Sequence, residues 1–432
     1  MDFFNNIIDY VSGLGSVELS YLFVIAFMLV LAIIDLTVGV SNDAVNFLSS
    51  AVGSRAAKLK HVLIVAACGV FIGAAFSSGM MDVARHGIFD PSFFSFKNVM
   101  CIYLAVVISD VFLLDLFNSL GLPTSTTVSM VFELLGASFI TALLSSSGEG
   151  LGMLNTDRAM TIIISIFLSV AIAFIFGLVV QWISRIIFTF HYRKNLGSKI
   201  GLYGGFASTA IIYFMLVKGL KGSTLKAQLP ASVQEFVFED TTMFLLCAFV
   251  VLTVLMQCLH WAKVNVLKVV VLMGTFSLAM AFAGNDLVNF IGVTLAGLES
   301  FQTFVEGGGD VGMSMGSLNL PATTNVLFLV GAGAVMVYAL FTSKKARKVL
   351  QTSIDLSSQQ DDGNEMFGTS SIARNMVRVV STSVDAVSKK TPQSVKDWIG
   401  KRFTPLEERE DVAFDLVRAS VNLVLAGLLI AL

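Results

Sequence analysis

Long apolar runs follow one another along most of the chain, and short polar stretches separate them. A helix that crosses a bilayer needs roughly 20 apolar residues. The runs that approach this length cover about 20–43, 61–81, 98–118, 123–144, 160–190, 200–218, 241–262, 264–298, 321–342 and 411–432. Because an unpaired backbone group is costly in lipid, we expect all of them to be helical. The run 264–298 is too long for one helix, and Gly284-Asn285-Asp286 is expected to interrupt it.

Composition places these runs in a membrane. Only 13% of the 432 residues are charged and 55% are hydrophobic, whereas soluble domains carry about 25% charged residues. The predicted fold class is therefore all-α: a polytopic membrane protein of about ten helical segments, some of them broken or re-entrant. A net charge of −2 argues against a nucleic-acid partner. The four cysteines lie in apolar runs without a Cys-x-x-Cys pair, which indicates neither a disulfide framework nor a zinc site.

One stretch, residues 343–410, differs from the rest, because it holds 21 of the 58 Lys, Arg, Asp and Glu residues. We interpret it as a soluble insertion. Its apolar residues recur at helical spacing, which predicts an amphipathic helix on the membrane surface rather than a regulatory domain. These residues are Ile372, Met376, Val379, Val380, Val384 and Val387.

Basic residues in the loops predict the orientation, since cytoplasmic loops carry an excess of Lys and Arg. Counting runs between three basic clusters places all three on one side, which we take as cytoplasmic. The protein is then expected in the cell membrane, with the N-terminus outside and the insertion inside. The clusters are Arg55, Lys58 and Lys60; Arg185, Arg193, Lys194 and Lys199; and Lys344, Lys345, Arg347 and Lys348.

A short polar motif occurs twice within the apolar runs. Asn42–Phe47 recurs as Asn285–Phe290, with five of six positions identical. The two copies lie in runs of opposite direction, which predicts an inverted repeat of the kind found in transporters. Within each copy the two Asn and the Asp share one helix face and offer donors and acceptors to an ionic ligand. A polar seam between two helices is the alternative, and the duplication in opposite senses favours the ligand site.

Gly121–Thr127 is the second unusual segment. Pro123 breaks a helix, and Ser125, Thr126 and Thr127 can cap the helix that follows. A helix N-terminus at membrane depth presents free N–H groups, and the hydroxyls turn it into an anion cradle without Lys or Arg. An ordinary N-cap is the alternative, but it does not require so many hydroxyls.

Acidic residues dominate the ionisable groups within the runs. They are Asp35, Asp43, Asp110, Asp115, Glu133 and Asp286, against Lys268. Carboxylates in a membrane are costly and bind cations. Together with an anion cradle they predict cation-coupled anion uptake. We single out Asp43 and Asp286 because the sequence repeats them; the other acids serve equally well as contacts between helices.

These motifs resemble the PiT family of inorganic phosphate transporters. Its Gly-x-Asn-Asp-x-x-Asn-type signature is matched by Ser41-Asn42-Asp43 through Asn46 and by Gly284-Asn285-Asp286 through Asn289, and its Gly-Leu-Pro-x-Ser-Thr-Thr hairpin by Gly121–Thr127. The resemblance covers most of residues 20–342 and the last run. It implies a Na⁺- or H⁺-coupled phosphate symporter with phosphate held between two repeats. Family members are often dimers, so a homodimer is an arrangement open to this chain.

The chain departs from the family pattern in two ways. Val128 follows Ser-Thr-Thr where the family usually has His, and a second Ser-Thr-Thr hairpin is missing. Leu320–Thr324 is similar, but Pro321 follows Asp286 by 35 residues, whereas Pro123 follows Asp43 by 80. We therefore interpret it as the start of a run, and we expect the chain to be part of a longer transporter.

The expected site combines both motifs with the hairpin. The expected phosphate ligands are Ser125, Thr126, Thr127, Asn42, Asp43, Asn285 and Asp286. The expected ligands of the cation, Na⁺ or H⁺, are Asp43, Asn46, Asp286 and Asn289. No catalytic residue and no cofactor is expected. The expected organisation is a first repeat over 1–200, a second over 201–342, the insertion over 343–410 and incomplete final runs over 411–432.

Two other functions stay open at this point. A permease for another tetrahedral oxyanion, chiefly sulfate, would carry much the same motifs. A membrane-embedded enzyme acting on lipid phosphates is less favoured, because the four His are scattered and no Walker-type phosphate loop is present.

Overall fold

The computed structural model describes residues 13–77, 83–144, 152, 154–192, 197, 199–219, 229–320, 325–358, 370–404 and 412–431. Within these ranges the regular structure is helical, apart from two isolated β-bridges. Six of the described helices are long and apolar enough to cross a membrane, a bent pair is a seventh candidate, and three further apolar helices are shorter. This confirms the prediction of an all-helical polytopic membrane protein.

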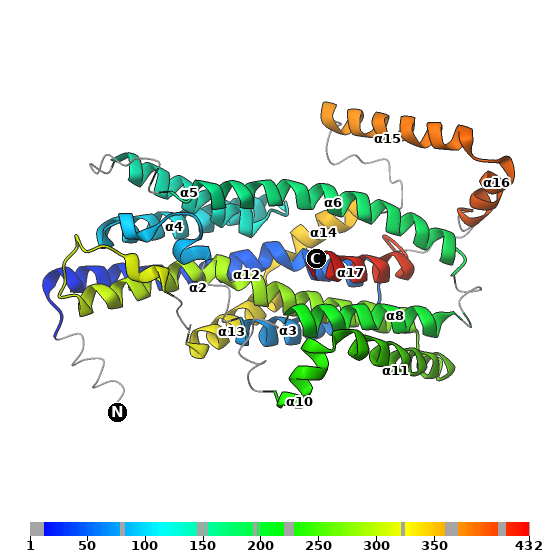
Figure 1. Cartoon of the computed structure of the whole chain (residues 1–432), viewed down its shortest axis with the longest axis horizontal. Helices are drawn as coiled ribbons and strands as arrows, with labels where there is room; N and C mark the ends of the chain where they lie inside the picture. The colour runs from blue at the N-terminus through cyan, green and yellow to red at the C-terminus, as the bar shows by residue number, and fades with distance from the viewer. Residues whose placement is uncertain are drawn as a thin grey trace.

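Thirteen helices of the described residues carry the architecture (Figure 1). They are α2 (Ser16–Gly53), α3 (Leu59–Ala75), α4 (Phe96–Leu120), α5 (Thr126–Leu144), α6 (Thr156–Phe188), α8 (Ile200–Ile212), α11 (Thr241–Trp261), α12 (Val266–Glu306), α13 (Val326–Thr342), α14 (Lys344–Ser357), α15 (Ser371–Lys390), α16 (Gln393–Arg402) and α17 (Leu416–Ala431). Short elements connect them: η1 (Val83–Gly87), η2 (Pro91–Phe93), η4 (Tyr213–Gly219), α10 (Ala231–Gln234), η5 (Glu235–Glu239) and η6 (Gly316–Asn319). Pro321–Thr324 of the hairpin-like segment, and Arg193 and Lys194 of the second basic cluster, lie outside the described residues.

An antiparallel pair of very long helices, α2 and α12, forms the centre of the bundle. They have 38 and 41 residues, which corresponds to about 57 and 62 Å, or about twice the thickness of a bilayer core. The expectation that 264–298 is more than one helix is wrong, because α12 continues through Gly284-Asn285-Asp286 without a break. Its burial explains why: α12 is covered by neighbours along most of its length, so packing outweighs the weak helix propensity of these three residues.

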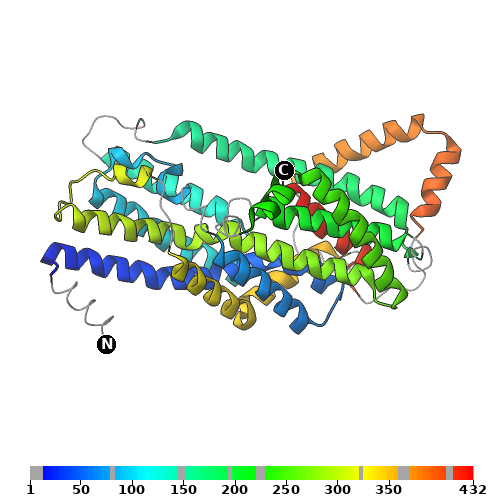
Figure 2. The ribbon, with the colours of Figure 1, turned by 60° about the horizontal axis from the view of Figure 1, so that its bottom comes forward.

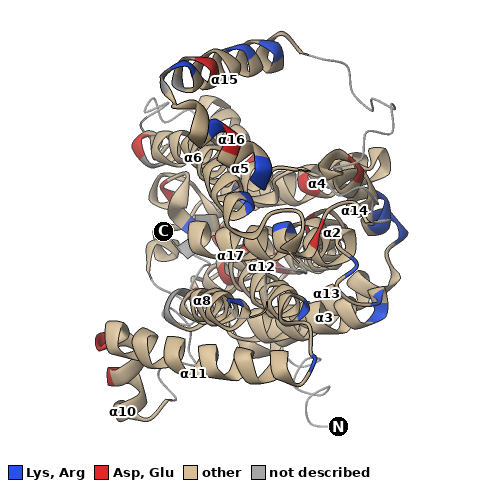
Figure 3. Cartoon of the chain, turned by 90° about the vertical axis from the view of Figure 1, so that its right-hand side faces the viewer, with Lys and Arg blue, Asp and Glu red and all other residues tan. Residues whose placement is uncertain are grey.

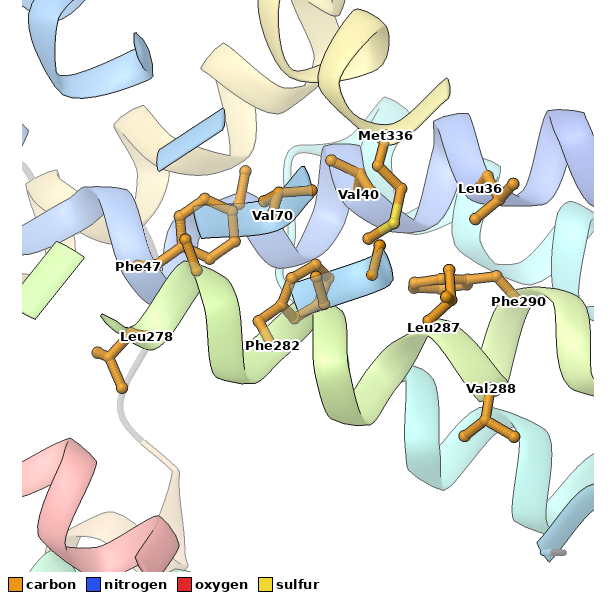
Figure 4. Close-up of a cluster of buried hydrophobic side chains, with 14 of the residues drawn as sticks. Leu36, Val40, Phe47, Val70, Leu278, Phe282, Leu287, Val288, Phe290 and Met336 are labelled. Carbon is orange, nitrogen blue, oxygen red and sulfur yellow. The ribbon is translucent and has the colours of Figure 1, made fainter. Parts of the chain in front are cut away.

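Close contacts set the register of the pair. Added side-chain atoms at Gly39 would collide with the Phe290 ring, and Gly297 packs on Met28. Further along, the rings of Phe47 and Phe282 lie 5.4 Å apart. Figure 4 shows this apolar core, to which α13 contributes Met336.

Two helices of 17 residues, α3 and α13, pack beside the central pair. Gly69 and Gly73 of α3 lie directly on the backbone of α12 at Phe276–Met280. Such close approach of helix backbones in membranes depends on small residues. α13 packs against both α3 and α2, and its Gly333 meets Ala74.

The outermost helices face lipid. None of the most apolar window of α6 is buried, and only 6% of that of α11. Side chains such as Phe167 and Val250 are mostly exposed on them, and exposed apolar surface of this extent suits hydrocarbon rather than water.

The residues expected to form an insertion contain three helices. α14 packs on the bundle with Ala346, Val349, Leu350 and Ile354 buried, while all described side chains of α15 except Ser388 are exposed. α15 contains the run that was predicted to be an amphipathic helix, and α16 follows it (Figure 2).

We predict that Gly73→Ala destabilises the protein, because the new Cβ would lie 2.0 Å from the Met280 carbonyl oxygen, which belongs to backbone and cannot rotate away. Overpacking of this kind costs about 1–3 kcal/mol, so the unfolding temperature in detergent should fall. Gly331→Ala is the matched control, since its Cβ would meet nothing within 4 Å in another apolar helix. Equal unfolding temperatures for the two variants would contradict this packing.

Candidate functional site

The tip of the α4–α5 hairpin is a break between two helices, as the sequence predicted. Gly121 ends α4 in the left-handed region, with φ 77°, which glycine adopts without strain. Leu122–Ser125 are not helical, and α5 begins at Thr126. The Ser125 hydroxyl accepts a hydrogen bond from the Val128 N–H at 3.3 Å, so Ser125 acts as a cap. We call Gly121–Ser125 the hairpin tip.

Asn42 of α2 fixes the hairpin tip. Its side-chain NH₂ donates to the Asn118 side-chain oxygen at 2.8 Å and to the Leu122 carbonyl at 3.1 Å, and its own oxygen accepts from the Thr124 N–H at 2.7 Å. Asn118 in turn donates to the Val38 carbonyl at 2.8 Å. Asn42 and Asn118 are both fully buried. The buried polar groups of α2 and of the hairpin thus satisfy each other's hydrogen-bonding capacity.

The first turn of α5 joins both copies of the Asn-Asp motif. The Thr126 hydroxyl donates to the Asp43 carboxylate at 2.9 Å and accepts from the Asn289 amide at 3.3 Å. Asn289 also donates to the Thr127 hydroxyl at 2.9 Å. Asp43 of α2 and Asn289 of α12 therefore meet at the Thr126 hydroxyl, and Asn289 also reaches Thr127.

The remaining expected ligands lie at the margin of this group. Asn285 donates to Asp286 at 3.1 Å; Asn285 is exposed and Asp286 is half-buried. Asp286 is close enough to Asp43 to interact with it electrostatically. Asn46 is exposed. The structure therefore brings Asn42, Asp43, Asn289, Thr126 and Thr127 together, whereas Asn46 and Asn285 are not bonded into the group.

Reciprocal serine contacts, which were not expected from the sequence, flank both motifs. At the end of α3, the Ser77 hydroxyl donates to the carbonyl of Gly284, the residue before Asn285, at 2.7 Å. At the end of α13, Ser343 accepts at 2.7 Å from Ser41, the residue before Asn42. Each short helix thus ends against the motif of the other half, and serines at these ends are the only sequence signal of it.

Helix α14 begins beside the hairpin tip. Ser343 caps it by accepting from the Ala346 N–H at 3.1 Å. Lys345 pairs with Asp115 of α4, and Lys348 donates to the Ser119 carbonyl, both at 2.5 Å. Part of the third basic cluster therefore binds the end of α4 instead of lying free in a loop. Asp115, one of the acids within the expected runs, is half exposed in this pair.

Three other acids form a cluster of their own. The Ser129 hydroxyl of α5 contacts Asp110 at 2.5 Å and Glu133 at 2.9 Å. Asp35 of α2 interacts with Asp110 through their side chains. Asp35 and Asp110 are almost completely buried. The sequence offered these acids as contacts between helices or as ligands, and the structure brings them to one place; we call them the acid cluster.

A helix N-terminus carrying hydroxyls, set among amides and carboxylates inside a multi-pass bundle, is typical of membrane transporters for ionic substrates. A family model described as the phosphate transporter family matches residues 39–383. The chain belongs to that family, so it is a transporter and not an enzyme.

Individual relatives agree with this assignment. A protein of Pyrococcus horikoshii named as a phosphate permease is 28% identical over 311 residues, which are 70% of each chain. A Bacillus subtilis protein named as a low-affinity inorganic phosphate transporter is 26% identical over 147 residues, which are 34% of this chain and 41% of the relative. A solved structure named as a sodium-dependent phosphate transporter has 18% identity and a TM-score of 0.53, and the match covers 77% of this chain and 78% of its own. This last likeness shows a shared fold.

We predict that Asn42→Ala lowers the unfolding temperature well below that of Asn46→Ala. The first change removes three hydrogen bonds and leaves buried groups of the hairpin tip unsatisfied, at about 1–3 kcal/mol for each group. Asn46 lies one turn away on the same helix and is exposed, so its truncation should change stability little. Similar unfolding temperatures for both variants would show that Asn42 does not hold the tip.

Proposed function

We propose that the protein imports inorganic phosphate by cation symport, with alternating access to a site between two inverted repeats. The observation that carries the proposal is the meeting of Thr126 and Thr127 with Asp43 from one motif copy and Asn289 from the other. The proposed phosphate ligands are Ser125, Thr126, Thr127, Asn42, Asp43, Asn285 and Asp286. The proposed cation ligands are Asp43, Asn46, Asp286 and Asn289, with Na⁺ or H⁺ as the cation.

The chemistry of this group suits an anion and a cation together. The N-terminus of α5 offers N–H groups, a positive dipole end and hydroxyl donors to phosphate oxygens. Asp43 and Asp286 would repel phosphate unless a cation lay between them. Moving two negative charges into a negative-inside cell costs about 4.6 kcal/mol at about 100 mV, which co-transported cations offset.

The arrangement of helices supports two inverted repeats. α2 and α12 run antiparallel and each carries one motif copy, and each half supplies a 17-residue helix, α3 or α13. The serine contacts at the ends of α3 and α13 are reciprocal. On this basis residues 1–200 contain the first repeat and residues 201–342 the motif-bearing part of the second.

The helix arrangement is compatible with the orientation expected from the basic clusters. α4 begins at one end of the bundle and α5 returns to the same end (Figures 1 and 2). The hairpin therefore leaves the basic clusters before and after it on the side that the sequence predicts. Figure 3 looks onto the opposite end, near which α16 lies, and it shows Lys and Arg on both α15 and α16. We propose that this end is cytoplasmic and that the N-terminus is outside.

We predict two separable effects on uptake of labelled phosphate into proteoliposomes. Asp43→Asn and Asp286→Asn should reduce the dependence of uptake on a cation gradient. Thr126→Ala should weaken apparent phosphate affinity about tenfold to a hundredfold, because a hydrogen bond to a charged group contributes about 1.5–3 kcal/mol. Thr141→Ala is the control, since Thr141 lies on the same helix and bonds only within it at Ala137.

Two outcomes of this assay would overturn the proposal. Uptake that depends on neither a sodium nor a proton gradient would contradict cation symport. Unchanged transport kinetics in the three site variants would contradict the assignment of the site. Competition separates the substrates: arsenate should inhibit uptake and sulfate should not. Inhibition by sulfate alone would assign the site to that oxyanion.

A further inference from the structure

The acid cluster lies outside the proposed phosphate site and joins three helices. Asp35 comes from α2, Asp110 from α4, and Ser129 and Glu133 from one face of α5. The exposed fractions of Asp35 and Asp110 are 1% and 2%. Three carboxylates cannot share such a place in ionised form, because each loses its hydration and repels the others.

The hydrogen bonds of the acid cluster need more hydrogens than the Ser129 hydroxyl supplies. A hydroxyl has one hydrogen to donate, and an ionised carboxylate has none. Ser129 lies within hydrogen-bond distance of both Asp110 and Glu133, so at least one of these contacts needs a hydrogen on a carboxyl group. Asp35 interacts electrostatically with Asp110 and would add a further negative charge to the cluster if it were ionised. The geometry around Ser129 therefore requires at least one hydrogen beyond that of the hydroxyl.

The cluster also has unfilled hydrogen-bonding capacity. Within the described residues, Asp35 Oδ1, Asp110 Oδ2 and Glu133 Oε2 are buried without a hydrogen-bond partner. The Thr294 hydroxyl of α12 is also buried and unpartnered. It shares a helix face with Phe290 and Gly297, which meet α2 at Gly39 and Met28, so the register places it at the level of Asp35.

The charged groups on the surrounding helices do not neutralise the cluster. On α2 the next acid is Asp43, and α12 carries Asp286 and Glu299. Three cations close to these helices pair with other residues: Arg85 with Glu299, Lys345 with Asp115, and Arg185 of α6 with Asp415. Lys97 and Lys268 are exposed in the first turns of α4 and α12, far along each helix from the cluster. Among the described residues, no three of His, Cys, Asp or Glu are arranged as ligands of a metal ion. Hydrogen ions fit the geometry better than a metal.

One helix connects the cluster to the phosphate site. The first turn of α5 bears Thr126 and Thr127, which meet Asp43 and Asn289, and the next turn bears Ser129. A change in the contacts of Ser129 can therefore be passed along α5 to the adjacent turn, which would hold phosphate. Asp35 precedes Asp43 by eight residues on α2, about 12 Å along the axis.

We propose that Asp35, Asp110 and Glu133, of which Ser129 bridges the last two, form a proton-binding site that holds at least one proton and couples proton movement to phosphate transport through α5. This inference rests on the proposed phosphate transport but uses none of its ligands. The cations at Asp43 and Asp286 belong to a separate site.

Infrared spectroscopy of the purified full chain in lipid nanodiscs, at neutral pH and without sodium, tests the protons directly. The wild type should show the C=O stretch of protonated carboxylic acids in a buried environment. Glu133→Gln and Asp110→Asn should each weaken this band, and Asp157→Asn, which alters an exposed acid at the start of α6, should leave it intact. Absence of the band in the wild type would overturn the proposal even if every variant misfolded. Loss of the band on adding sodium would assign the site to Na⁺ instead.

A transport assay distinguishes failure of the proton site from failure of the proposed phosphate transport. Proteoliposomes that enclose a pH-sensitive dye report the protons moved for each labelled phosphate. Glu133→Gln should lower that ratio while phosphate still enters, and Asp157→Asn should keep it. Phosphate entry with an unchanged ratio in Glu133→Gln would refute the proton site alone, whereas a wild type that moves no phosphate would refute the proposed function.

Discussion

The Thr126 hydroxyl is the contact on which the rest of the site depends. It donates to Asp43 on α2 and accepts from Asn289 on α12, so one atom joins both central helices to the hairpin. In a bilayer each of these buried polar groups must find its partner within the protein. The position of α5 is therefore fixed by the α2–α12 pair, and the pair in turn is fixed by glycine contacts that bring Gly39 against Phe290. Apolar packing sets the register of α2 against α12, and this register brings the polar residues of the site together.

The antiparallel register also explains why the two motif copies are used differently. The hairpin reaches the pair from the end at which α4 begins (Figure 1). It therefore meets the first Asn of α2, Asn42, and the second Asn of α12, Asn289, because the helices run in opposite directions. Asn46 and Asn285 lie towards the other end and are exposed. The two motif copies thus form a single hydrogen-bonded group with the hairpin, and each copy contributes a different Asn to this group.

Much of this could be predicted from the sequence. The apolar runs predicted the helices, Pro123 and Gly121 predicted the break, and the repeat of Asn42–Phe47 as Asn285–Phe290 pointed to the residues that meet there. The continuity of α12 could not be predicted, because Gly284-Asn285-Asp286 favours a break locally, whereas the buried residues on both sides of this segment hold α12 as one helix. The place of α14 was missed for a similar reason: its lysines suggest a loop, but Lys345 and Lys348 bind the end of α4. The acid cluster needed the structure, since Asp35, Asp110 and Glu133 share no spacing in the chain.

The central claim is that phosphate lies at the N-terminus of α5 between the two motif copies. An experimental structure with bound arsenate tests it most directly, because arsenic can be located by its anomalous scattering. The account predicts a single strong peak within hydrogen-bond distance of the Thr126 and Thr127 hydroxyls, beside Asp43 and Asp286. A peak elsewhere in the bundle, with this position empty, would contradict it.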